Sequence, residues 1–292
     1  MSASLTNADS GQGELFRANL RSRPAVYFAA LASAGAFVYG ASQRDLLIMV
    51  LGPLAAVALV AVTAAVMADR GAATNFYRHY AVSLGLVYWP RASLPPLTPL
   101  LGAGDRRWLE HWMQGQLPGE PALAGGIGQL VWEEREDGGN DNALTLGKVA
   151  SRHRLSICAV DLEASIRRFH GIFLRPRRGL ISPIPDWRRA HTRAIQVESL
   201  AFSERYELLV ADDQDEIMAR QLLSPSLVIW LAEHPLAPGF ELRAGMLVVF
   251  VDRSLEDEGN LTYLLDAARR IAARVADETR DAAVRPAATP AP

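Results

Sequence analysis

Three side chains in this sequence have the chemistry of a catalytic set: His170, Asp213 and Cys158. A histidine can transfer protons near neutral pH, a carboxylate can orient it, and a thiolate is a nucleophile. Such a set works only if the fold brings the three side chains into one pocket. The cysteine also has a structural interpretation, because it lies in the apolar run 155–162, as buried thiols commonly do.

Metal and cofactor sites have weaker support in the sequence. The acidic run 212–216 could bind a divalent cation, but it lacks the alternating spacing and central glycine of a calcium loop. Asp213 followed by Glu216 instead predicts a helix capping box. One cysteine excludes an intramolecular disulfide and any multi-cysteine metal site, and the glycines at 125–128 precede a strand-like run rather than a helix. We therefore predict no metal and no cofactor.

Basic charge is concentrated in one segment. Residues 152–193 contain ten arginines against three acids, whereas residues 198–281 contain eight arginines against seventeen acids. Five arginines flank or follow prolines in the irregular part of the first segment and form a candidate basic patch: Arg175, Arg177, Arg178, Arg188 and Arg189. The patch is either a solvated surface, compensated by the acidic segment, or a face that meets anionic lipid headgroups or a partner. The overall net charge of −2 argues against nucleic acid as the partner.

The elements that must position these residues begin with two apolar runs. Residues 25–42 and 46–68 contain no charged side chain, and Arg44 and Asp45 lie in the short connection between them. At a rise of about 1.5 Å per residue, each run can cross a hydrocarbon core of roughly 30 Å. The sequence therefore predicts a two-helix transmembrane hairpin. A signal peptide or a buried core hairpin would be the alternatives, but a second full-length apolar run without a polar face disfavours both.

Arginines flank the hairpin unevenly. Arg17, Arg21 and Arg23 precede the first run, whereas the connection has one arginine beside an aspartate. Arg70, Arg78 and Arg91 follow the second run. The positive-inside rule then places both termini in the cytoplasm of a multi-pass protein of the inner (plasma) membrane. We expect disordered tails at 1–24 and 281–292, because both are polar or rich in proline and alanine.

The region 71–280 alternates between strand-like and helix-like patterns. These predict a cytosolic α+β domain with mainly antiparallel strands, following the transmembrane hairpin. Asp105 is the expected N-cap of the first helix, and 125–128 is an expected turn. The expected helices are 105–116, 213–223, 225–233 and 261–279, and the expected strands are 82–89, 129–135, 144–149, 155–162, 166–174, 194–199, 206–210, 240–243 and 246–251.

An ordered set of short motifs resembles a bacterial family of membrane-anchored proteins of unknown function. The set comprises Phe169-His170-Gly171-Ile172-Phe173, Val197-Glu198-Ser199, Ala219-Arg220-Gln221-Leu222-Leu223-Ser224-Pro225 and Phe240-Glu241-Leu242-Arg243. The resemblance covers the two apolar runs and most of residues 150–252. It implies two N-terminal spans and a cytosolic domain, and it brings no catalytic residues with it.

These patterns allow three functions. A membrane-tethered, non-enzymatic interaction or accessory module that binds a protein partner is our main hypothesis. The alternative is a membrane-bound enzyme that acts on a lipid or envelope substrate through His170, Asp213 and Cys158. A two-span transporter is the weakest, because neither apolar run contains an ionisable residue that could form a polar path.

Overall fold

The computed structural model describes residues 71–119, 122–135, 149–177 and 191–284, together with positions 39, 54, 55 and 58. The chain divides into two compact units, Met1–Tyr77 and Arg78–Pro292. The two expected transmembrane runs lie outside the described residues except for those four positions, which are helical. Within the described part of the chain, no helix combines the length and the apolar character that a membrane span requires.

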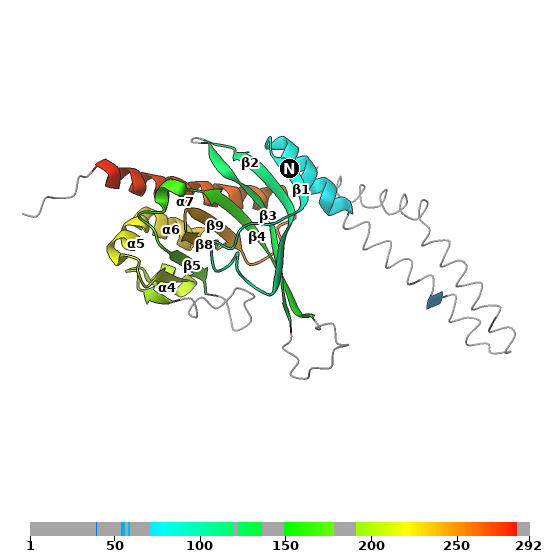
Figure 1. Cartoon of the computed structure of the whole chain (residues 1–292), viewed down its shortest axis with the longest axis horizontal. Coiled ribbons are helices and arrows are strands. Elements are labelled where there is room, and N and C mark those ends of the chain that lie inside the picture. Colours follow the sequence, from blue (N-terminus) through cyan, green and yellow to red (C-terminus); the bar gives the residue numbers. More distant parts are fainter. Residues whose placement is uncertain are drawn as a thin grey trace, which may run out of the picture. The chain divides into compact units, whose positions relative to one another are not determined.

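The second unit is built on a nine-stranded sheet in the order β1-β2-β3-β4-β9-β8-β5-β7-β6 (Figure 1). Every neighbouring pair of strands is antiparallel, which confirms the expected α+β class with an antiparallel sheet. The strands are β1 Val87–Ala92, β2 Arg106–Leu117, β3 Leu123–Arg135, β4 Val149–Asp161, β5 Ile172–Pro176, β6 Thr192–Ile195, β7 Tyr206–Ala211, β8 Gly239–Arg243 and β9 Met246–Val251.

The expected strand at 82–89 is wrong in its position. Residues 71–83 are helical, and β1 begins only at Val87. Gly85, with φ of 69°, ends the helix in a Schellman motif: Leu86 N donates to Ala81 O at 2.8 Å, and Gly85 N donates to Val82 O at 3.1 Å. Pro90 lies inside β1, which is possible because β1 is an edge strand.

The expected helix at 105–116 is also wrong, because this segment is strand β2. Leu109 and Trp112, three residues apart, both belong to one core cluster, and this spacing resembles a helical face. A β-bulge produces it: the register shifts between Glu110 and Met113, and His111 has φ of 52°. One extra residue in a strand returns a side chain three positions later to the same face.

The expected turn at 125–128 lies inside β3. Its glycines are needed for packing: a Cβ at Gly126 would lie 2.3 Å from Cζ2 of Trp112. The absent side chain therefore leaves room for the indole of the neighbouring strand. The expected strand at 166–174 also begins late, at Ile172, because the 3₁₀ helix η1 (Glu163–Ser165) continues into a turn in which Arg168 N and Phe169 N donate to Ser165 O.

Most of the last third forms as expected. The hairpin β8–β9 turns at Ala244-Gly245, where both φ angles are positive (51° and 76°), and it lies between β4 and β5 in the sheet. The helices are α4 Leu200–Arg205, α5 Glu216–Leu222, α6 Pro225–Glu233 and α7 Glu258–Val284. The cap of α5 is Asp215 rather than the expected Asp213, since its Oδ1 accepts from Ile217 N at 2.7 Å.

Two layers cover the sheet. Helix α7 packs against β4 and β9, and its apolar face from Leu261 to Val275 is buried (Figure 1). A core cluster on the other face contains Trp132, Ile157 and Phe250 and no residue of α7. We call residues 93–105, between β1 and β2, the strap, because Leu100, Leu101 and Ala103 join this cluster. The strap is fixed by buried Glu241 of β8, whose two carboxyl oxygens accept from Leu100 N at 3.1 and 2.9 Å.

Candidate functional site: an arginine cleft at the edge of the sheet

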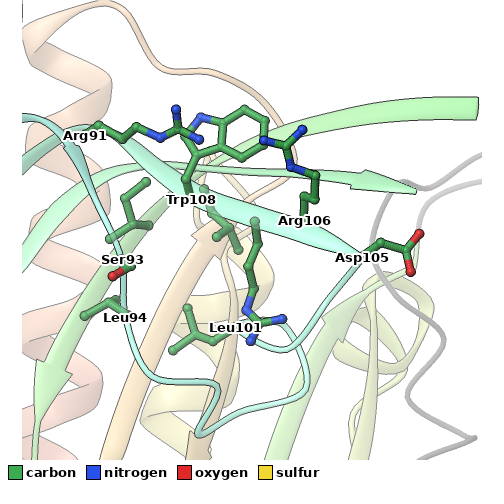
Figure 2. A pocket seen from close by; sticks show the side chains of 10 residues that line it. Arg91, Ser93, Leu94, Leu101, Asp105, Arg106 and Trp108 are labelled. Atoms are coloured by element: carbon green, nitrogen blue, oxygen red, sulfur yellow. The ribbon is translucent and has the colours of Figure 1, made fainter. Parts of the chain in front are cut away.

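A cleft of about 470 Å³ lies where the strap leaves the sheet. The last pairing between β1 and β2 joins Ala92 to Leu109, whereas β2 pairs with β3 from Arg106 onward. The first three residues of β2 therefore have a neighbouring strand on one side only. Strap residues Ser93, Leu94 and Leu101 form the facing wall (Figure 2).

Three arginines line this cleft: Arg91 at the end of β1, and Arg106 and Arg107 at the start of β2. Successive residues of a strand point to opposite faces, so Arg106 and Arg107 approach the open edge from both sides of the sheet. None of the three guanidinium groups has a hydrogen-bond or ion-pair partner within the described part of the chain. Asp105 also borders the cleft, and Figure 2 shows its carboxylate pointing away from Trp108.

The indole of Trp108 is held firmly in this site. Arg91 Cζ lies 4.7 Å from its ring centroid and Arg152 Cζ lies 5.2 Å from it. The indole Nε1 donates to Glu110 Oε1 at 2.9 Å. Glu110 in turn accepts from Arg152 at 2.9 Å and from Arg154 at 2.5 Å. Stacking orients Arg91 through its ring contact and leaves its N–H groups available, whereas Arg152 and Arg154 both donate to the carboxylate of Glu110.

The floor of the cleft is closed. Leu101, Leu109 and Leu130 border it but are only 1%, 1% and 2% exposed, because they pack into the core cluster. The accessible surface of the cleft is therefore dominated by arginine and tryptophan. Guanidinium groups without carboxylate partners, beside an aromatic ring, form a site that can bind a compact anion.

The basic patch expected from the sequence is only partly within the described residues. Arg175 lies in β5, opposite Glu207 of β7. Arg177 is exposed, and its Nε donates to the carbonyl oxygen of Tyr206 at 2.9 Å. Arg178, Arg188 and Arg189 lie outside the described residues. The patch therefore stays a prediction.

The three expected catalytic residues do not meet. His170 Nδ1 and Asp213 Oδ2 lie 3.3 Å apart on the surface, where their side chains are 47% and 74% exposed. Cys158 is fully buried in β4, and burial raises the pKa of its thiol to about 12. A thiol with that pKa stays protonated at neutral pH, so Cys158 is a core residue rather than a nucleophile.

The acidic run 212–216 has structural roles in the described region. Asp215 caps α5, and Glu216 accepts from Arg220 and Arg193 at 2.8 Å each. Hydrogen bonds from these two arginines lower the pKa of the Glu216 carboxyl. Among the described residues, no group of three or more histidine, cysteine, aspartate or glutamate side chains could hold a metal ion.

Sequence reasoning missed the cleft because it assigned residues 105–116 to a helix. In a helix, the side chains of Arg106 and Arg107 would point about 100° apart around the helix axis. In β2 they start from opposite faces of the strand, at the edge of the sheet. One signal could have revealed the site. The sequence Arg106-Arg107-Trp108 follows a proline-rich turn region, and if these residues are assigned to a β-strand, both arginines lie at the start of that strand.

Comparison with known proteins gives one distant structural likeness. No family model and no curated protein matches the chain. The crystal structure of the mycobacterial trehalose monomycolate transport factor A, TtfA, aligns with a TM-score of 0.46 and 12% sequence identity. The alignment covers 71% of this chain and 94% of that one.

Proposed function

We propose that this chain is a membrane-tethered binding module, without catalytic activity, that holds an anionic group of its partner in the arginine cleft. The observation that carries the proposal is the state of the three cleft guanidinium groups. Arg91, Arg106 and Arg107 line one cavity and have no acidic or carbonyl partner within the described residues. All three side chains are exposed to solvent, and an anionic ligand would supply the counter-charge that no described residue provides.

The sequence supports the tether. The two apolar runs at 25–42 and 46–68 and the resemblance to a membrane-anchored family both favour an inner-membrane hairpin with a cytosolic domain. A tether restricts the cleft to a thin layer beside the bilayer, where a weak site meets lipid headgroups or other membrane proteins at high effective concentration. At such a concentration, a shallow cleft of low intrinsic affinity would still be occupied by its ligand.

The enzyme hypothesis keeps one supporting observation. His170 and Asp213 lie within 3.3 Å, which is the geometry of a histidine oriented by a carboxylate. The nucleophile assigned to that set is a buried thiol whose pKa is about 12. A hydrolytic role would therefore require water as the nucleophile, and loss of activity in His170→Gln would be its test.

The binding proposal is tested by calorimetry on the full-length protein in a neutral detergent, with pyrophosphate as the probe. We expect binding by the wild type that weakens as salt rises. Replacing Arg91, Arg106 and Arg107 together by Gln should abolish it. The matched control replaces Arg167, Arg243 and Arg253, which are exposed and lie outside the cleft, and should retain binding. Equal binding by both triple variants would reject the cleft as the site.

The tether is tested separately by cysteine labelling. Cys158 is buried, so the wild-type protein should react little with a membrane-impermeant maleimide. Arg44→Cys should be labelled in intact spheroplasts, whereas Arg167→Cys should be labelled only after the membrane is opened. Labelling of both cysteines from outside would contradict the proposed orientation.

A further inference from the structure

We infer that the group bound in the arginine cleft is a phosphate monoester. The inference rests on the proposed function and narrows it from anions in general to one chemical class. It is carried by the placement of the three arginines around a strand edge, by their net charge with the neighbouring acid, and by the closed floor of the cleft.

The placement of the arginines favours a tetrahedral anion over a planar one. Arg106 and Arg107 are neighbours in β2 and so start from opposite faces of the strand, and all three arginines line one cavity. Figure 2 shows Arg91 and Arg106 on either side of Trp108. Three guanidinium groups that line one cavity can donate to the three terminal oxygens of a phosphate group. A carboxylate presents two oxygens in one plane and would be matched by a single bidentate arginine.

Charge points to a dianion. Three arginines and Asp105 line the cleft, which gives it a net charge of +2. A phosphate monoester carries about −1.5 to −2 at pH 7, whereas a diester or a carboxylate carries a single charge. The nearby Arg152 and Arg154 share the single carboxylate of Glu110, so these three side chains add one further positive charge beside the cleft.

Because the floor of the cleft is closed, only the phosphate group of the ligand can enter it. Leu101, Leu109 and Leu130 are at most 2% exposed, so no alkyl chain can pass beneath the arginines without opening the core. The remainder of the ligand must extend into solvent or stay in the bilayer. The same head can thus come from a soluble phosphorylated compound or from a monoester lipid such as phosphatidic acid.

The test uses three soluble anions with the full-length protein in neutral detergent at pH 7.5: monomethyl phosphate, dimethyl phosphate and acetate. We expect monomethyl phosphate to bind at least about tenfold more tightly than the other two, because it has one more charge and one more terminal oxygen. Equal affinity for all three would overturn the phosphate inference while leaving the anion cleft in place. Absence of binding by every anion, pyrophosphate included, would overturn both.

Single substitutions of the cleft arginines test whether monomethyl phosphate binds in the cleft. Arg106→Gln and Arg91→Gln should each weaken monomethyl phosphate about tenfold or more, as expected for loss of a charge-assisted hydrogen bond. Arg106→Lys keeps the charge but loses the fork of donors and should rescue binding only in part. Arg167→Gln is the matched control, and thermal unfolding of each variant verifies folding. Unchanged affinity in Arg91→Gln and Arg106→Gln would contradict the inference.

A reconstitution experiment distinguishes the two sources of the phosphate. The full chain is placed in phosphatidylcholine vesicles that contain phosphatidic acid or, as a control of lower headgroup charge, phosphatidylglycerol. If the lipid headgroup occupies the cleft, phosphatidic acid should weaken the binding of monomethyl phosphate, and phosphatidylglycerol should do so much less. Equal affinity in both membranes would assign the cleft to a soluble phosphate, and equal weakening by both lipids would contradict monoester selectivity.

Discussion

Two groups of arginines, one in each half of this domain, differ in their pairing. In the half that contains β5–β9 and α4–α7, four arginines are held by shared acids: Arg193 and Arg220 bind Glu216, and Arg168 and Arg274 bind Glu278. In the meander β1–β4, Arg91, Arg106 and Arg107 face a cleft without acidic partners in the described residues. Paired arginines hold elements of the fold together, and unpaired ones in a cavity are available to a ligand.

The comparison shows that the number of arginines in a segment says little about its binding capacity. Arg152 and Arg154 belong to the most basic segment of the sequence, yet both are bound by Glu110 from a distant strand position. The three cleft arginines are outside that segment. Pairing across strands, rather than local composition, decides which charges remain available.

The largest expected effect concerns Glu241, which connects the two halves by holding the strap of the meander. Burial raises the pKa of this carboxyl from its ordinary value of 4.5 to about 8. Between these two pH values the folded state keeps a proton on Glu241 that the unfolded state releases. The free energy of unfolding is therefore highest below pH 4.5 and decreases as the pH rises through 8. The loss should reach at most about 5 kcal/mol.

Chemical denaturation from pH 4.5 to pH 9 measures this effect. Glu241→Gln keeps an acceptor for Leu100 N without an ionisable proton, and it should flatten the pH dependence in this range. A variant with the same slope as the wild type would show that another group is responsible.

The second effect is steric and tests the meander. Gly126→Ala places a methyl group 2.3 Å from the Trp112 ring, and the indole must move to accept it. We expect destabilisation of about 1–3 kcal/mol in urea unfolding. Gly259→Ala in α7 is the control, because its Cβ would meet Asp257 Oδ1 at an ordinary 3.5 Å, and no loss is expected there.

A third, smaller effect contrasts the two classes of arginine. Glu278→Gln removes the shared partner of Arg168 and Arg274, and its side chain is only 11% exposed, so we expect a loss of about 2 kcal/mol. Arg106→Gln should change stability by less than about 0.5 kcal/mol, because the guanidinium group has no partner within the described residues to lose. Comparable losses in both variants would remove the distinction between the halves.

The two halves also differ in how well the sequence predicted them. Helix α6 and the hairpin β8–β9 follow from local signals: Ser224 with Pro225 starts the helix, and the turn pair Ala244-Gly245 separates two apolar runs. In the meander, the bulge at His111 gave β2 the spacing of a helix, and the glycines of β3 looked like a turn. Those features depend on the neighbouring strand, which a local pattern does not contain.

The candidate site could not be predicted from the sequence, because it also depends on how the strands pair. Recognising Arg91, Arg106 and Arg107 as one group requires knowing that β1 ends before β2 does, which is a property of strand pairing. His170 and Asp213, by contrast, were identified from residue type, and the fold does bring them together. The location of Cys158 in an apolar run correctly indicated a buried thiol.

The most direct measurement is a paired titration and unfolding experiment on the wild type, Arg106→Gln and Glu278→Gln. Each full-length protein is titrated calorimetrically with monomethyl phosphate and then unfolded in urea under the same conditions. We expect Arg106→Gln to lose affinity by about tenfold while keeping its stability, and Glu278→Gln to lose stability while keeping its affinity. Unchanged affinity in Arg106→Gln, or a loss of affinity in Glu278→Gln equal to that in Arg106→Gln, would contradict the assignment of the cleft as the binding site.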